Sequence, residues 1–90
     1  MDFDENIIKA RLLYHLRRKS VIGGVHTHFD TLKRGFPKHL GKEVENIAKG
    51  LIKEGLLIKK PTSYGLQVSL NKDKLMIIDQ LISKVLGVGV

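Results

Sequence analysis

One stretch of the sequence, residues 38–55, limits the possible folds more than any other. Its apolar residues recur at the spacing of one face of an α-helix, namely Leu40, Val44, Ile47, Ala48, Leu51 and Ile52. The opposite face carries polar and basic side chains, namely His39, Lys42, Asn46, Lys49 and Lys53. Pro37 stands where a helix tolerates a missing N–H, and Gly55 stands where a left-handed residue ends a helix. The pattern predicts an amphipathic helix with a core on one side and a basic surface on the other.

That basic surface has two explanations. A lysine-rich face is typical of a solvated helix, and it also suits a polyanion. The chain has 90 residues and a net charge of +7, and residues 20–65 hold eight cations against four acids. We therefore expect an anionic partner to bind the middle of the chain. Nucleic acid is the first candidate, and an acidic protein or a membrane surface comes after it.

Length and composition exclude several other classes. Ninety residues make a single domain, 1–90, without room for a second core. The chain has no cysteine, which excludes disulfides and thiolate metal sites. No apolar run approaches the roughly 20 residues that span a bilayer, and the acidic start is unlike a signal peptide. The expected compartment is the cytoplasm, without membrane association.

Two further helices are predicted near the ends of the chain. Residues 4 to about 18 form the first, which Asp4 caps, and residues 72–86 form the last, between the cap Asn71 and the terminating Gly87. The apolar stripe of the last helix consists of Leu75, Ile78, Leu81, Ile82 and Val85. This stripe could pack on the first helix or, in a homodimer through residues 72–86, on a second copy of the chain.

The region before the central helix reads as a short extended piece and a short helix. Val21, Ile22 and Val25 predict the extended piece, which the turn signal Gly23-Gly24 interrupts. A helix of one or two turns over residues 30–34 is then expected, with Asp30 as its cap and Gly35 at its end. Two helices joined by a tight turn predict a helix-turn-helix arrangement.

A β-hairpin is predicted after the central helix. Residues 56–60 and 66–70 read as strands, and the second of them alternates between apolar and polar side chains. Residues 61–65, Pro-Thr-Ser-Tyr-Gly, favour a five-residue loop between the two strands. Tyr64 is expected to pack at the base of this hairpin, and the alternative is that its ring stacks on a nucleic-acid base.

This order of elements resembles a winged helix-turn-helix domain. The segment Leu51-Ile52-Lys53-Glu54-Gly55-Leu56-Leu57 is similar to the family's passage into the wing, and Tyr64-Gly65-Leu66-Gln67-Val68-Ser69-Leu70-Asn71 to its return strand. Residues 22–71 are similar to small uncharacterised archaeal winged-helix proteins. The resemblance implies an α+β fold with a three-helix core, a β-hairpin wing and an extra C-terminal helix. It divides the chain into a first helix (1–19), a helix-turn-helix (30–55), a wing (56–70) and a C-terminal helix (71–86).

Such a fold would bind duplex DNA with the central helix as its recognition helix. The candidate DNA-binding residues are Lys33, Arg34, Lys38, His39, Lys42, Asn46, Lys49, Lys59, Lys60, Thr62 and Ser63. The lysines would neutralise phosphates, and Asn46 could pair with adenine or be a solvated amide. Because the central helix has no arginine, we expect modest sequence specificity. The hairpin lysines could contact the DNA backbone or could prevent edge-to-edge strand pairing.

The expected function is therefore DNA binding, with a role in the regulation of transcription. The alternatives are a protein- or RNA-interaction module of a larger complex and, less favoured, a metal-responsive repressor that uses His26, His28 and His39. The sequence contains no group of acids, nucleophiles or glycines that would support catalysis. We therefore predict no enzyme activity, no catalytic residues and no cofactor.

Overall fold

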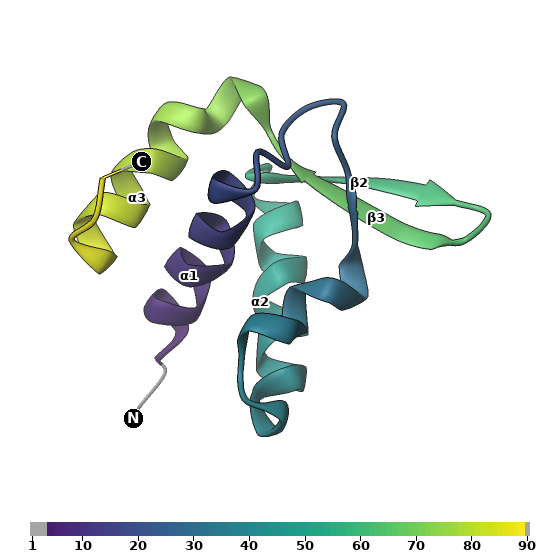
Figure 1. Ribbon diagram of the computed structural model, residues 1–90, viewed down its shortest axis with the longest axis horizontal. Helices are drawn as coiled ribbons and strands as arrows, with labels where there is room; N and C mark the ends of the chain where they lie inside the picture. Colours follow the sequence, from purple (N-terminus) through teal and green to yellow (C-terminus); the bar gives the residue numbers. More distant parts are fainter. Residues whose placement is uncertain (1–3, 90) are drawn as a thin grey trace.

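The computed structural model describes residues 4–89, which form an α+β arrangement of helices beside a three-stranded sheet (Figure 1). The elements, in chain order, are α1 (Glu5–Arg18), β1 (Thr27–His28), η1 (Phe29–Gly35), η2 (Lys38–Leu40), α2 (Gly41–Lys53), β2 (Leu57–Thr62), β3 (Gly65–Leu70), η3 (Lys72–Lys74) and α3 (Leu75–Leu86). The segments named η are 3₁₀-helices. Because β3 lies between β1 and β2, the sheet order is β1-β3-β2, with antiparallel pairing. This order is compatible with a winged-helix-like arrangement.

The first helix begins at the predicted cap. The Asp4 carboxylate accepts a hydrogen bond from the Ile7 N–H at 2.9 Å, which satisfies one of the free donors at the helix start. The apolar face of α1 is buried almost completely and includes Ile8, Leu12, Leu13 and Leu16. This face supplies much of the hydrophobic core.

The region after α1 differs from the sequence prediction in two ways. The extended piece expected at residues 21–25 is reduced to one parallel bridge between Ile22 and Leu70, and the strand β1 follows later, at Thr27–His28. The short helix is a 3₁₀-helix that starts at Phe29, so Asp30 lies inside it and is not its cap. The physical reason is the spacing of the buried Phe29 and Leu32, which are three residues apart and so share a face when a turn has three residues.

The central amphipathic helix is confirmed, although its start is later than predicted. Residues 38–40 form a separate 3₁₀ turn after Pro37, and the α-helix α2 runs from Gly41 to Lys53. Its inward residues Val44, Ala48 and Leu51 are fully buried.

The end of α2 follows the sequence signal closely. Gly55 has a φ of 81°, and its N–H donates to the Ile52 carbonyl at 3.1 Å. The Leu56 N–H donates to the Leu51 carbonyl at 3.0 Å. These two bonds are the Schellman pattern that a glycine at this position permits.

The hairpin is longer and its turn tighter than predicted. Because Thr62 pairs with Gly65, the loop contains two residues, Ser63 and Tyr64, and not the five residues 61–65. Pro61 belongs to β2, which tolerates a missing N–H because it is an edge strand of the sheet. The Thr62 hydroxyl donates to the Gly65 carbonyl at 2.7 Å and accepts from the Tyr64 N–H at 3.2 Å, and both bonds fix the turn.

The last helix, α3, packs on α1. In Figure 1, α3 and the hairpin lie on opposite sides of α2. Ile78 and Ile82 are fully buried, and the left-handed Gly87 ends the helix as predicted. A 3₁₀ turn over Lys72–Lys74 precedes α3, so the α-helix begins three residues later than predicted. The apolar stripe that could have paired with a second copy thus packs largely within the chain. Dimerisation through residues 72–86 stays a prediction. No helix within residues 4–89 is long and apolar enough to cross a membrane.

Candidate nucleic-acid interface

The outward face of α2 presents most of the side chains that were predicted for it, but His39 lies on η2, before α2 begins. Lys42, Asn46 and Lys49 are all exposed, while the opposite side of the helix lies in the core. An acid, Glu43, is also exposed at the flank of this face. The face is therefore predominantly, although not uniformly, basic.

A second group of basic residues surrounds the turn between η1 and α2. Lys33, Arg34 and Lys38 line a hollow of about 440 Å³ together with Phe36, Pro37 and Gly41, and the set of lining residues contains no acid. We call this feature the turn hollow. Lys33 Nζ lies 3.6 Å from Glu45 Oε1, so part of its charge is already balanced. Arg34 and Lys38 are exposed, and the cations gathered here favour a bound anion.

The hairpin lysines lie on opposite faces of the sheet. Lys60 pairs with Gln67, which pairs in turn with His28, and paired residues of antiparallel strands share a face. Lys59 pairs with Val68, whose side chain is buried on the core side. Both lysines are exposed, but they do not form one cluster.

Among the other predicted residues, Ser63 is exposed in the hairpin turn and His39 is exposed on η2. Thr62 is half-buried, and its hydroxyl is occupied by the bonds that close the turn. Thr62 therefore holds the hairpin tip in shape, and its hydroxyl has less capacity for a partner.

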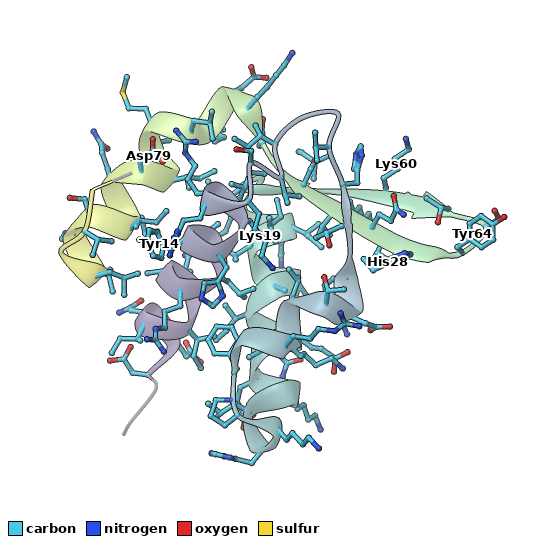
Figure 2. All side chains as sticks on the ribbon, viewed as in Figure 1. Tyr14, Lys19, His28, Lys60, Tyr64 and Asp79 are labelled. Atoms are coloured by element: carbon cyan, nitrogen blue, oxygen red, sulfur yellow. The ribbon has the colours of Figure 1, made fainter. Side chains whose placement is uncertain are left out.

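Tyr64 lies outside the set of candidate DNA-binding residues, and its predicted position is wrong. Its side chain is 87% exposed at the tip of the hairpin (Figure 2), whereas it was expected to pack at the hairpin base. The error follows from the loop length: in a two-residue loop, Tyr64 sits at the point farthest from the core. The two-residue loop follows from the pairing of Gly65 with Thr62. The local sequence does not distinguish this pairing from one that leaves a longer loop.

The ion pairs leave most of these cations without an acidic partner. Lys9 Nζ lies 3.0 Å from Glu54 Oε2, and Arg17 Nε lies 2.9 Å from Asp79 Oδ1. Both pairs involve α1 and not the candidate interface. Within residues 4–89, no ion pair engages Arg34, Lys38, Lys42, Lys49, Lys59 or Lys60.

The histidines do not form the arrangement that a metal-responsive protein would need. In the part of the chain that the structure describes, no three His, Asp or Glu side chains are placed to hold a metal ion together. His26 is half-buried before β1, and His28 is exposed in that strand. The metal alternative therefore gains no support from the geometry.

The candidate interface consists of the α2 face, the turn hollow and the hairpin tip. Each of these features is defined by burial, distance and charge in this structure, without reference to related proteins. Comparison with protein-family models, with curated proteins and with solved structures gives no match for the chain.

Proposed function

We propose that this protein binds double-stranded DNA as a winged helix-turn-helix domain, with α2 as its recognition helix. One observation carries the proposal: α2 turns Lys42, Asn46 and Lys49 outward, and the turn hollow adds Arg34 and Lys38 close to its N-terminal end. An α-helix fits the major groove of B-DNA, which is about 12 Å wide. The cations would release condensed counterions from the phosphates, and the Asn46 amide could pair with an adenine edge.

The order of the elements supports the same proposal. α1, η1 and α2 form the helical part, and the hairpin β2–β3 projects beyond it (Figure 1). Such a hairpin would act as the wing, which reaches DNA beside the recognition helix. The exposed Tyr64 at its tip would add a large apolar contact with a polar hydroxyl at its end. A role in regulating transcription in the cytoplasm is the corresponding biological proposal.

The salt dependence of binding tests this proposal. Fluorescence anisotropy of a labelled mixed-sequence duplex, titrated at several salt concentrations, should show affinity that falls steeply with salt. Each of the variants Lys38→Gln and Lys42→Gln should lower the slope of log affinity against log salt by about 1. Tyr64→Ala should weaken binding and leave that slope unchanged, because its contact carries no charge.

The matched control is Lys84→Gln, which removes an exposed lysine from α3, outside the proposed interface. It should change neither the affinity nor the slope. Equal effects of Lys42→Gln and Lys84→Gln would reject the proposed face. Binding of RNA or an acidic protein, together with no binding of duplex at low salt, would replace the proposal by the interaction-module alternative.

A further inference from the structure

A separate cleft lies between the C-terminal half of α1 and η1. It has a volume of about 440 Å³, within the range of sites for small molecules. Its lining residues are Leu12, His15, Leu16, Lys19, Val21, Thr27, Thr31, Leu32, Arg34 and Gly35. We call it the α1–η1 cleft. Figure 2 shows Lys19 between the end of α1 and the chain that descends through β1 into η1.

The floor of the α1–η1 cleft is aliphatic. Leu12, Leu16, Val21 and Leu32 are each at most 7% exposed, so these side chains are fixed by the core behind them. A hydrocarbon group placed on this floor would leave water without displacing any polar partner. The floor thus favours a ligand with an apolar body.

The rim of the cleft is basic. His15, Lys19 and Arg34 are its titratable residues, and no acid belongs to the described residues that line it. Burial lowers the pKa of His15, and the nearby positive charges of Arg11, Lys19 and Arg18 lower it further. Because the surrounding charges are positive, an anionic group is the one that this rim would stabilise.

The hydroxyls in the cleft do not compete for this role. Thr31 Oγ1 donates to the His28 carbonyl at 2.7 Å, and Thr27 Oγ1 lies 3.0 Å from Thr31 Oγ1. Thr31 therefore uses its proton internally, and Thr27 is positioned to do the same. The charged donors left for a ligand are the Lys19 ammonium and the Arg34 guanidinium. A guanidinium can bind a carboxylate through two parallel hydrogen bonds.

Gly35 completes the cleft by leaving room for the His15 ring. A Cβ atom at Gly35 would lie 2.5 Å from His15 Cε1, so any other residue would displace the ring. The ring also faces Phe36, with 6.0 Å between the centroids. The wall of the cleft is therefore shaped by contacts between α1 and η1.

We propose that the α1–η1 cleft binds a small carboxylic acid with an apolar body, such as an aromatic acid. The carboxylate lies between Lys19 and Arg34, and the hydrocarbon body covers the leucine floor. Inorganic phosphate fits less well, because it would stay hydrated and would gain nothing from the floor.

Amide chemical shifts of the full chain, titrated without nucleic acid, test this inference independently of the proposed DNA binding. Sodium benzoate should cause saturable shifts at Leu12, Val21 and Leu32 at millimolar concentrations. Benzamide, which has the same ring without the charge, should bind roughly tenfold more weakly, the ratio expected from one lost charge-assisted bond. Phosphate should cause no saturable shift at these residues.

Variants of the rim give a second, independent readout. Lys19→Gln and Arg34→Gln should each weaken benzoate binding several-fold, and the control Lys84→Gln should leave it unchanged. Equal affinities for benzoate and benzamide, or saturable binding of phosphate at the same concentrations, would overturn the assignment of the ligand class. Absence of saturable shifts with benzoate would reject the site.

Discussion

At the scale of single residues, His15 combines partial burial with a surrounding of positive charges. It is half-buried between α1 and η1, against Gly35 and Phe36, and it lies close to several cations of its own helix. Burial first, and then Arg11, Lys19 and Arg18, lower its pKa below the ordinary value of 6.5. Protonation of His15 is therefore less favourable in the folded protein than in the unfolded chain.

This difference predicts that acid weakens the fold. At pH values between 6.5 and the lower pKa of the folded state, His15 is protonated in the unfolded chain but not in the folded protein. The free energy of unfolding therefore has its full value, as far as His15 is concerned, above pH 6.5. It decreases as the pH falls from 6.5 to the pKa of His15 in the folded protein, and below that pKa His15 causes no further change. Urea denaturation at a series of pH values should show this loss for the native protein and a smaller one for His15→Gln.

His39→Gln is the matched control for that experiment, because His39 is exposed on η2. It should keep the pH dependence of the native protein. If His15→Gln and the native protein lost stability in parallel between pH 7 and pH 5, the effect would belong to other groups.

Residue-scale features were predictable from the sequence where their cause is local. Asp4 caps α1, and Gly55 and Gly87 adopt left-handed conformations, as the sequence predicted, because each depends on its immediate neighbours. Tyr64 and Asp30 were placed wrongly because their positions depend on strand register and on the burial of Phe29. The α1–η1 cleft has no local signal, since it joins residues 12–35 through tertiary packing.

At the scale of elements, Asn71 joins the end of α2 to the start of η3. Its Nδ2 donates to the Gly55 carbonyl at 2.8 Å, and its Oδ1 accepts from the Asp73 N–H at 3.0 Å. Its backbone N–H also donates to the Leu56 carbonyl at 3.0 Å. One side chain thus fixes the exit of the hairpin against the end of the candidate recognition helix.

Two substitutions separate the contributions of this side chain. Asn71→Ala removes both side-chain bonds and should lower the free energy of unfolding by about 2 kcal/mol, as expected for two hydrogen bonds, one of them a cap. Asn71→Asp keeps the accepting oxygen but loses the donor to Gly55, so about half of that loss should remain. Urea denaturation measures both variants. If Asn71→Asp were as stable as the native protein, the bond to Gly55 would contribute nothing.

The boundaries of the elements were harder to predict from the sequence than the elements themselves. The buried stripe of α2 was predicted correctly because its 3.6-residue period extends over the whole helix. The 3₁₀ turns that precede α2 and α3 were not predicted, because a single turn carries no period of its own. The sequence predicts Pro61 in the loop, but Pro61 pairs with Leu66 within β2, which accepts a proline because it is an edge strand.

At the scale of the whole molecule, Arg34 links the two basic hollows. It is among the residues that line both the α1–η1 cleft and the turn hollow. A guanidinium that binds a carboxylate in the cleft is less able to bind a phosphate at the turn hollow. The two proposed sites should therefore compete for one side chain, and the coupling must be reciprocal in free energy.

This competition gives a prediction that rests on both proposals. Saturating benzoate, at constant ionic strength, should weaken duplex binding by about fivefold, at the low end of typical coupling between sites. Benzamide should leave the affinity for duplex unchanged, because it brings no charge to Arg34. Anisotropy titrations with each compound measure the effect. In Arg34→Gln the affinity for duplex should be lower from the start and insensitive to benzoate, because the shared side chain is gone. If benzoate weakened duplex binding equally in Arg34→Gln and in the native protein, the coupling would not pass through Arg34, and the two hollows would act separately.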